Sequence, residues 1–293
     1  MRILITGSNG LLGQKIVRHC LENKHVFLAT SKGENRNPDC PQHLFQSMDI
    51  IDPHEIETVI STFKPTHVIH TAAITNVDHC ELNPLECQTV NTAAVGYLYD
   101  ISKRFGAHFQ LLSTDFVFDG LKGNYKESDK VGPLSVYACS KVEAENLLLK
   151  EKEGNWSIVR TIIVYGTGNN LSRSNIVVWA KDALKKGQEL SIVDDQFRAP
   201  TWADDLAWAC LEICRRNKVG IFHICGPETM SIYELVCRIA KHYGLSIDNV
   251  KRSSSKSLNQ PAKRPPRTGF DLSHARTELG YDPKTIEQTL DLI

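Results

Sequence analysis

Apolar and polar segments alternate regularly along the first half of the chain. Short runs that are apolar throughout, such as RILIT and HVFLAT, are separated by segments such as LLGQKIVRHCLEN, whose apolar residues recur at helical spacing. Continuous apolar runs are typical of strands buried on both faces of a sheet, and the intervening segments are typical of the helices that cover those faces. The pattern therefore predicts an α/β fold of the Rossmann type with a doubly wound parallel sheet.

The expected elements follow one another up to residue 166. We expect strands at residues 2–6, 25–30, 67–75, 108–118 and 156–166, and a further short strand before Asp49. We expect helices at residues 11–23, 53–64, 87–106 and 136–152. Each helix would then carry the chain back across the sheet to the next parallel strand.

After Gly166 the alternation gives way to a smaller and looser unit. Here we expect helices at residues 175–187, 203–217, 231–244 and 273–280, and strands at residues 189–195 and 221–225. We expect the region 195–227 to return to the sheet. The predicted division is a dinucleotide-binding Rossmann domain of residues 1–168 with 195–227, and a smaller C-terminal α/β substrate-binding domain of residues 169–194 with 228–293.

A glycine-rich turn lies between the first strand and the first helix. In ITGSNGLLGQK, Gly7, Gly10 and Gly13 recur at three-residue spacing. Glycines allow the backbone to turn tightly and to approach a pyrophosphate, which the helix N-terminus attracts. The position of the triplet favours dinucleotide binding over a plain tight turn. The residues expected to contact the cofactor here are Gly7, Asn9, Gly10, Leu11 and Leu12.

The type of nicotinamide nucleotide is indicated after the second strand. An acid there would bind the ribose 2′-hydroxyl of NAD, whereas basic or small polar residues admit the 2′-phosphate of NADP. The chain has Ser31 and Lys32, which favours NADPH with NADH as the alternative, although Lys32 could equally be a solvated loop lysine. Asp49 and Ile50 follow the next expected strand, where Asp49 could hydrogen-bond the adenine amino group.

The segment YACSK places Tyr137 and Lys141 four residues apart, on one face of an expected helix. A phenol has a pKa of about 10 in isolation, and a nearby ammonium lowers it. A tyrosine tuned in this way can give its proton to a carbonyl oxygen while hydride reaches the carbon. Such pairs are common on helices, so only the position of this pair in the fold can indicate that it is catalytic.

Two hydroxyls stand where an apolar strand is expected to open toward solvent. Ser113 and Thr114 follow HFQLL, and they either cap local backbone or face a ligand. In a doubly wound sheet, ligands bind beyond the carboxyl ends of the strands. The glycine turn, the strand-end hydroxyls and the Tyr–Lys pair come in this order along the chain, each at the element where a reductase needs it.

Essentially the whole chain resembles the extended short-chain dehydrogenase/reductases, and most of all the dTDP-4-dehydrorhamnose reductase family. The motifs that carry the resemblance are GSNGLLGQ, TAAITNVDHCE, VNTAAV, STDFVFDG, YACSKVEAE, VRTIIVYG, DDQFRAPTWADDLA and RPPR. The resemblance implies NADPH-dependent reduction of the keto group of a nucleotide-linked 4-keto-6-deoxy sugar. Tyr137 would be the proton donor, Lys141 would orient the ribose, and Thr114 would hold the substrate oxygen. Ala72 and Ala73 would pass along the cofactor.

Phe116 separates this chain from related sugar-nucleotide dehydratases. Those enzymes carry Asp and then Glu after the strand-end hydroxyls, whereas here Asp115 is followed by Phe116. The second acid is missing, so simple carbonyl reduction is expected rather than elimination of water.

Two positions depart from the rhamnose-type pattern. Ile163 stands where a tryptophan is usual, and Arg198 stands where a glycine is usual. A guanidinium suits phosphate because it donates in a planar fork. Arg198 could therefore bind a nucleotide diphosphate or form an ion pair with Asp194 or Asp195, and Arg264 has the same two interpretations. The substrate contacts expected overall are Thr114, Asp115, Ile163, Asn175, Arg198 and Arg264.

The resemblance also admits a second function. The regulatory subunit of methionine adenosyltransferase is similar, keeps the cofactor site, and also lacks the tryptophan that Ile163 replaces. The intact set of Thr114, Tyr137 and Lys141 favours the enzyme over such a regulatory subunit.

Composition and charge exclude several other classes. Net charge is zero and no apolar stretch approaches the length of about 20 residues of a membrane span, so we expect neither nucleic acid nor membrane as a partner. Nine cysteines without a framework fit a reducing cytoplasm. The pair Cys210 and Cys214 lacks a second pair, so no metal site is predicted. A homodimer remains an open alternative.

Overall fold

The computed structural model describes all 293 residues and contains one sheet of seven parallel strands. In spatial order these are β11 (Gly220–Ile224), β6 (Trp156–Thr161), β5 (His108–Thr114), β4 (His67–His70), β1 (Arg2–Thr6), β2 (Val26–Ser31) and β3 (Phe45–Ser47). The strand order changes direction at β1 and β4, where doubly wound sheets bind ligands. The predicted fold class is confirmed.

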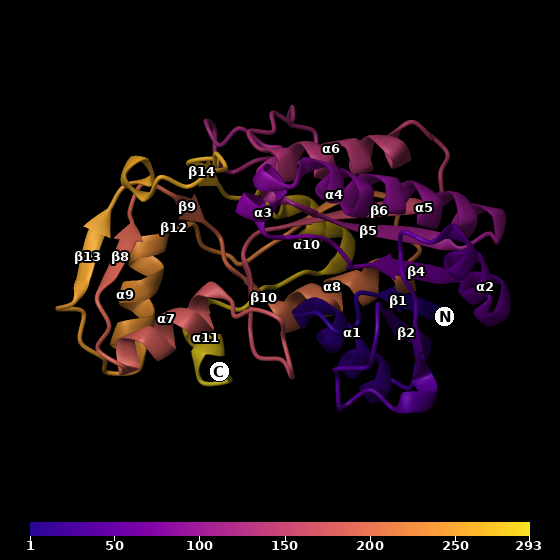
Figure 1. Cartoon of the computed structure of the whole chain (residues 1–293), viewed down its shortest axis with the longest axis horizontal. Coiled ribbons are helices and arrows are strands. Elements are labelled where there is room, and N and C mark those ends of the chain that lie inside the picture. The colour runs from indigo at the N-terminus through magenta and orange to yellow at the C-terminus, as the bar shows by residue number, and fades with distance from the viewer.

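Helices cover both faces of this sheet (Figure 1). One face packs against α1 (Leu11–Glu22), α8 (Ala203–Arg215) and α10 (Ser273–Leu279). The other packs against α2 (Pro53–Phe63), α5 (Ala94–Arg104) and α6 (Val136–Leu149). None of the helices is both long enough and apolar enough to cross a membrane.

The helix expected at residues 87–106 is interrupted. The chain forms α3 (Val77–Leu82), α4 (Pro84–Gln88), a π-helical turn η2 (Thr89–Ala93) and then α5. Asn91 lies in η2, where its side chain accepts from the backbone N–H of Ile74 (2.8 Å) and donates to the Ile74 carbonyl (3.0 Å). These bonds fix the helix against the segment after β4, and a π turn at such a place is typical of functional regions.

Three expected strands are shorter than predicted. The strand at 67–75 ends at His70, and the strand at 108–118 ends at Thr114, where the 3₁₀ turn η3 (Asp115–Val117) begins. The strand at 156–166 is divided into β6 and β7 (Val164–Tyr165). The break comes at Ile162–Ile163, because the Thr201 hydroxyl donates to the Ile162 carbonyl and the Thr201 N–H donates to the Ile163 carbonyl.

A second, smaller lobe has its own apolar core. It consists of the parallel pair β8 (Leu190–Val193) and β13 (Val250–Ser253) with α7 (Ile176–Lys185), α9 (Ile232–His242) and α11 (Ile286–Leu290). Short strands complete the fold: β7 pairs with β10 (Thr201–Trp202), and β9 (Phe197–Arg198) pairs with β12 (Met230–Ser231) and β14 (Arg267–Thr268).

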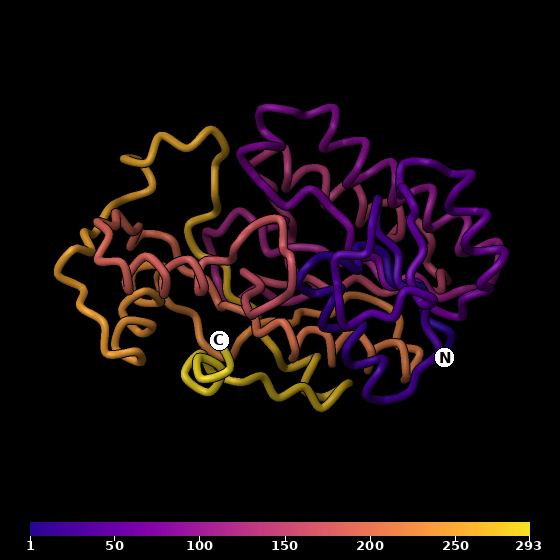
Figure 2. The backbone as a smooth tube through the Cα atoms, turned by 60° about the horizontal axis from the view of Figure 1, so that its bottom comes forward, coloured from indigo at the N-terminus to yellow at the C-terminus, as the bar shows by residue number.

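The chain passes repeatedly between the two lobes. The helices α8 and α10 come from the second half of the sequence, yet they lie with the large sheet (Figure 1), and β11 pairs with β6 in that sheet. In the tube view, orange and yellow parts of the chain accordingly occur in both lobes (Figure 2). The large sheet includes the expected return of the 195–227 region through β11, while the proposed domain boundaries stay a prediction. The buried hydroxyls of Tyr165 in β7 and Thr289 in α11 lie 2.7 Å apart and join the last helix to the lobe.

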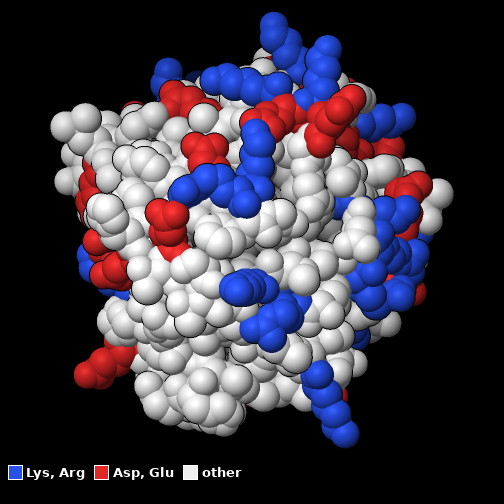
Figure 3. Space-filling model, turned by 90° about the vertical axis from the view of Figure 1, so that its right-hand side faces the viewer, with Lys and Arg blue, Asp and Glu red and all other residues white.

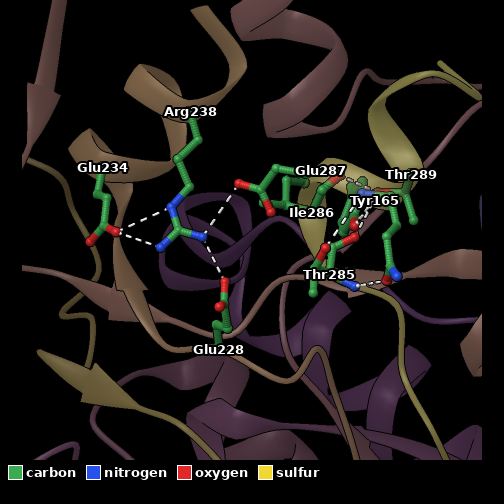
Figure 4. Close-up of polar contacts among 9 residues, drawn as sticks. Tyr165, Glu228, Glu234, Arg238, Thr285, Ile286, Glu287 and Thr289 are labelled. Carbon is green, nitrogen blue, oxygen red and sulfur yellow. Dashed lines mark hydrogen bonds and ion pairs between the residues drawn. The ribbon is translucent and has the colours of Figure 1, made fainter. Parts of the chain in front are cut away.

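Charged side chains on the second lobe are paired at its surface. Arg238 of α9 donates to Glu228 (2.6 Å) and Glu234 (2.8 Å) and lies 3.4 Å from Glu287 of α11 (Figure 4). Because Arg238 is partly exposed, these pairs contribute little stability each. On the right-hand side of Figure 1, cations and anions are interspersed among uncharged atoms (Figure 3).

Candidate active site

The glycine turn joins β1 to α1 at the carboxyl edge of the sheet. Gly7 has a φ of +71°, which glycine adopts without strain. A Cβ on Gly7 would lie 2.6 Å from the backbone nitrogen of Ala72, and one on Gly13 would lie 2.3 Å from the Gly7 carbonyl oxygen. Gly10 is the N-cap of α1, no side chain caps it, and the first turn has no acidic residue. The positive end of the helix is therefore open to a phosphate.

The remaining residues of the turn connect it to the loop after β2. Leu11 and Leu12 open α1 and are half-buried. The side chain of Asn9 donates to the Glu34 carbonyl and accepts from the N–H of Arg36, both at 2.8 Å. Asn9 thus holds the loop beside the turn.

The residues expected at the adenosine end lie together beyond β2 and β3. Ser31 accepts a hydrogen bond from the N–H of Asn9 at 3.1 Å. The Lys32 ammonium lies 2.7 Å from the Asp49 carboxylate, and 76% of the Lys32 side chain is exposed. An ion pair this exposed is weak, so Lys32 remains accessible to a phosphate. Ile50, which follows Asp49, is buried in the core.

Gln14 was not predicted from the sequence, but its side chain hydrogen-bonds the loop at Asn169 to the glycine turn. Its Oε1 accepts from the N–H of Asn169 (2.8 Å), and its Nε2 donates to the carbonyls of Asn169 (2.7 Å) and Asn9 (3.1 Å). The Asn169 side chain also donates to Asp39 at 3.2 Å. The loop after β7 is therefore fixed both to the glycine turn, through Gln14, and to the loop after β2, through Asp39.

The segment after β4 lies at the same edge of the sheet. Ala72 and Ala73 follow β4 after one residue and are half-buried. The backbone of Ala72 faces Gly7, and the next residue but one, Ile74, is fixed by Asn91. This backbone is thus held from both sides next to the glycine turn.

The polar strand end of β5 caps local backbone. The Thr114 hydroxyl accepts from the N–H of Phe116 (3.2 Å) and donates to the Asp115 carboxylate (3.1 Å). The Ser113 hydroxyl donates instead to Glu145 of α6. Successive strand residues point to opposite faces, which explains why the two hydroxyls have different partners.

Tyr137 and Lys141 lie on α6, as expected, and both face inward. Ser135 caps this helix by accepting from the N–H of Ala138 at 3.3 Å. Tyr137 is 8% exposed and Lys141 is 3% exposed. The Lys141 ammonium donates to the carbonyl of Leu112, one residue before Ser113, at 2.6 Å. The helix therefore holds both side chains against the end of β5.

The protonation states of the pair differ from the expectation. Burial raises the pKa of Tyr137 above its ordinary value, and the Thr114 hydroxyl opposes this only in part. The expected lowering of the Tyr137 pKa is therefore not found, because burial dominates; the Lys141 ammonium donates instead to the Leu112 carbonyl. Burial lowers the pKa of Lys141 to about 8. At neutral pH the pair is a phenol and an ammonium, which is the state that can donate a proton.

Arg198 is buried in β9, with 2% of its side chain exposed. Its Nε lies 3.7 Å from the Asp115 carboxylate, and its Nη2 donates to the Pro265 carbonyl at 2.7 Å. The structure thus has an ion pair, but not with Asp194 or Asp195 as the sequence suggested. The pairing of β9 with β14 brings Arg198 to the end of β5, which no local pattern reveals.

Arg264 also forms an ion pair. Its two Nη atoms lie 2.7 and 3.1 Å from the two carboxylate oxygens of Asp78 in α3. Because α3 packs against α6, this bidentate pair closes the C-terminal segment onto the helix that carries Tyr137. Fork-like pairs of this kind fix geometry as well as charge.

The last two candidate substrate contacts are Asn175, at the start of α7 in the second lobe, and Ile163, between the two lobes. Asn175 is the N-cap of α7: it accepts from the N–H of Val178 (3.2 Å) and donates to the Gly166 carbonyl (2.7 Å). Ile163 has a φ of +33°, which is strained for a β-branched residue, and its side chain contacts the cores of both lobes. Backbone strain of this kind is often found at ligand sites.

Sequence reasoning also missed Glu145 and Arg160. They form a buried ion pair at 2.6 Å directly behind the end of β5. The available signal was the spacing of Lys141 and Glu145, which places a cation and an anion one helical turn apart on α6.

Comparison with known proteins identifies the family. The family described as RmlD substrate binding domain matches residues 1–293, the whole chain. The chain belongs to the RmlD substrate-binding domain family. This confirms the resemblance to dTDP-4-dehydrorhamnose reductase and the extended short-chain dehydrogenase/reductase fold.

Relatives of this RmlD-family chain include enzymes and a subunit with another name. A dTDP-4-dehydrorhamnose reductase from Aggregatibacter actinomycetemcomitans is 31% identical, over 99% of this chain and 97% of that protein. Methionine adenosyltransferase 2 subunit beta from Bos taurus is 28% identical, over 97% of this chain and 84% of that protein.

Solved structures show the same RmlD-type fold. A hypothetical dTDP-4-dehydrorhamnose reductase from Sulfolobus tokodaii has a TM-score of 0.87 at 30% identity, covering 99% of this chain and 98% of that chain. The dTDP-4-dehydrorhamnose reductase from Bacillus anthracis, in complex with NADP, has a TM-score of 0.82 at 24% identity, covering 99% and 97%.

Proposed function

We propose that this chain is an oxidoreductase that uses NADPH to reduce the keto group of a nucleotide-linked 4-keto-6-deoxy sugar. The observation that carries the proposal is that Thr114, Tyr137 and Lys141 come together at the carboxyl edge of the sheet. This is the edge at which the glycine turn offers a phosphate site. A proton donor and a dinucleotide site at one strand edge are what carbonyl reduction requires.

The residues present fit a nicotinamide dinucleotide. Gly7 and Gly13 leave no room for a Cβ, so the turn packs closely against the Ala72 backbone, and no side chain caps Gly10 at the start of α1. The N-terminus of α1 would hold the pyrophosphate, and Ser31 with the accessible Lys32 would hold the 2′-phosphate. When bound, the dinucleotide supplies the hydride. NADH is the alternative, and the Bacillus anthracis relative was solved with NADP.

The chain's own residues supply the acid and the positioning. Thr114 would hold the keto oxygen, and Tyr137 would give its phenol proton to that oxygen as the carbon is reduced, which yields the alcohol. Solvent would then reprotonate Tyr137. Lys141, as an ammonium, would orient the cofactor ribose, while Ala72 and Ala73 would border the cofactor.

Reduction is favoured over elimination because of Phe116. Its ring lies beside Tyr137, so no second carboxyl group is present next to the proton donor to remove a proton from the sugar. Asp115 does not fill that role, because its carboxylate is bound to Thr114, Thr268 and the Arg198 ion pair.

The candidate substrate contacts differ in whether their side chains are already bonded to protein groups. We propose that strained Ile163 borders the sugar, and that Arg264 can reach a diphosphate if it leaves Asp78. Asp115, Asn175 and Arg198 are bound to protein groups and would shape the pocket rather than bind the nucleotide directly.

A second candidate function is that of a non-catalytic NADP-binding subunit. The similarity to methionine adenosyltransferase 2 subunit beta and the absence of a tryptophan at Ile163 favour it. The complete set of Thr114, Tyr137 and Lys141 favours the enzyme.

Two measurements decide between these functions. NADPH binding is followed by quenching of protein fluorescence, and failure to bind either NADPH or NADH would contradict both candidates. NADPH oxidation is then measured with a panel of nucleotide-linked 4-keto sugars, for which we expect turnover that is lost in Tyr137→Phe. Cofactor binding without turnover, together with a copurifying partner enzyme, would favour the regulatory subunit.

A further inference from the structure

A buried ion pair lies behind the strand end, and the proposed reaction does not use it. Glu145 of α6 and Arg160 of β6 each expose 2% of their side chains. Arg160 donates through Nε to Oε1 (3.0 Å) and through Nη2 to Oε2 (2.6 Å) of Glu145. The Ser113 hydroxyl donates to the same Oε1. The carboxylate is thus fixed by a fork and by the strand end.

Stability alone does not explain this pair. Removing two charges from water is costly, and well-packed apolar side chains often serve a protein interior as well or better. The pair instead stands next to the proposed chemistry. Glu145 lies one turn beyond Lys141 on the same helix face, and Lys141 donates to Leu112, the neighbour of Ser113. Two consecutive residues of β5 are therefore held by two side chains of α6.

We infer that Glu145 is a positioning residue that keeps Lys141 as an ammonium and fixes Ser113, so that the end of β5 presents Thr114 correctly. The inference rests on the proposed function, in which the Lys141 ammonium orients the cofactor. Arg160 holds the Glu145 carboxylate in place through the fork, while its own positive charge competes with Lys141 for that carboxylate.

The charge of Lys141 depends on the groups that surround it. Burial lowers the pKa of Lys141 to about 8, and the Glu145 carboxylate opposes this lowering. His70 is neutral, because burial, and secondarily the charge of Lys141, lowers its pKa to about 3. The titratable groups that face Lys141 are His70 of β4, Cys87 of α4 and Glu145 of α6, with Tyr137 one turn away on the same helix face. Arg160 of β6 lies behind them, bound to Glu145.

The direct test is the titration of Lys141 by NMR of the protein labelled with carbon-13 at lysine Cε. The resonance is assigned from its absence in Lys141→Arg. In Glu145→Gln we expect the titration to move to lower pH by about one unit, the size expected for loss of a nearby opposite charge. The exposed Glu143 lies on the same helix, and Glu143→Gln should leave the titration unchanged.

A role in packing alone is separated from a role of charge by two further variants. Glu145→Asp keeps the carboxylate. Its shift of the Lys141 pKa relative to the wild type should be at most about half of that in Glu145→Gln. Arg160→Gln removes the competing cation and should move the titration to higher pH. This opposite shift tests the inference even if Glu145→Gln does not fold.

An unchanged Lys141 titration in both Glu145→Gln and Arg160→Gln would overturn the inference. The NMR measurement requires no turnover, so it remains valid if the wild-type chain reduces no keto sugar. In that event the proposed reduction fails, whereas the link between Glu145 and Lys141 is still confirmed or refuted by the titration.

Discussion

The ring of Phe116 packs edge-on against the ring of Tyr137, with 6.1 Å between centroids and 74° between planes. The guanidinium of Arg198 lies over the Phe116 ring, 5.4 Å from the ring centroid. An apolar ring therefore separates the proposed proton donor from the buried arginine. This arrangement keeps the phenol protonated and leaves no acid for elimination.

Replacing Phe116 with an acid should damage the protein without changing its chemistry. Phe116→Glu would place a carboxylate beside Tyr137, where it would compete with Asp115 for the Arg198 guanidinium, and the burial of this extra charge should lower the free energy of unfolding by about 2 kcal/mol. Phe116→Leu keeps the apolar contact and should retain most NADPH oxidation. Urea denaturation and a product assay by mass spectrometry check both variants. Loss of water from the sugar in Phe116→Glu would contradict our view that Asp115 is unavailable for elimination.

The activity should fall on the alkaline side as Lys141 loses its proton. Because burial lowers the pKa of Lys141 to about 8, the ammonium is present below that pH and lost above it. Burial raises the pKa of Tyr137, so the phenol does not cause this fall. The pH profile of kcat/KM reports groups of the free enzyme and should show this limb. Lys141→Arg stays charged and should lose the limb, whatever its absolute rate; an identical limb in that variant would refute the assignment.

The ion pair between Asp115 and Arg198 should be structural. Asp115→Asn leaves a buried guanidinium without its counter-charge, which should lower the free energy of unfolding by about 3 kcal/mol. The double variant Asp115→Asn/Arg198→Met removes both charges and should recover part of this loss. Urea denaturation measures the wild type, Asp115→Asn, the double variant and Arg198→Met. If Arg198→Met alone left stability unchanged but weakened nucleotide-sugar binding, the guanidinium would be a diphosphate ligand instead.

The hydrogen bonds of the Gln14 side chain should strengthen cofactor binding. Gln14→Ala removes three hydrogen bonds that hold the loop at Asn169 against the glycine turn. We expect NADPH to bind roughly ten-fold more weakly, equivalent to about 1.4 kcal/mol. Fluorescence titration measures the Kd, and Gln188→Ala in the exposed loop after α7 is the control. An unchanged Kd in Gln14→Ala would show that the loop does not support the site.

The fold could be predicted because the strands of the large sheet are apolar throughout and the helices are amphipathic. The errors lie where a side chain ends an element. Thr114 caps η3, Asn91 fixes the π turn, and Thr201 divides β6 from β7. In each case a single polar residue bonds backbone that would otherwise have continued, and periodicity does not register such bonds.

The candidate site was predictable to the extent that it is local. The glycine turn and the Tyr–Lys pair lie at the expected element ends, because each is defined by spacing within one segment. The partners of Arg198 and Arg264 were not predictable, since Asp115 and Asp78 reach them only through the tertiary fold. The same holds for the lowered pKa of Lys141, which burial causes.

The most direct test of the central claim follows the hydride itself. The protein is incubated with a nucleotide-linked 4-keto-6-deoxy sugar and NADPH that carries deuterium at both C4 positions of the dihydronicotinamide. Our account predicts a product alcohol with one deuterium on the former keto carbon, and no such product with Tyr137→Phe. A product without deuterium at that carbon, or an equal yield from Tyr137→Phe, would contradict it.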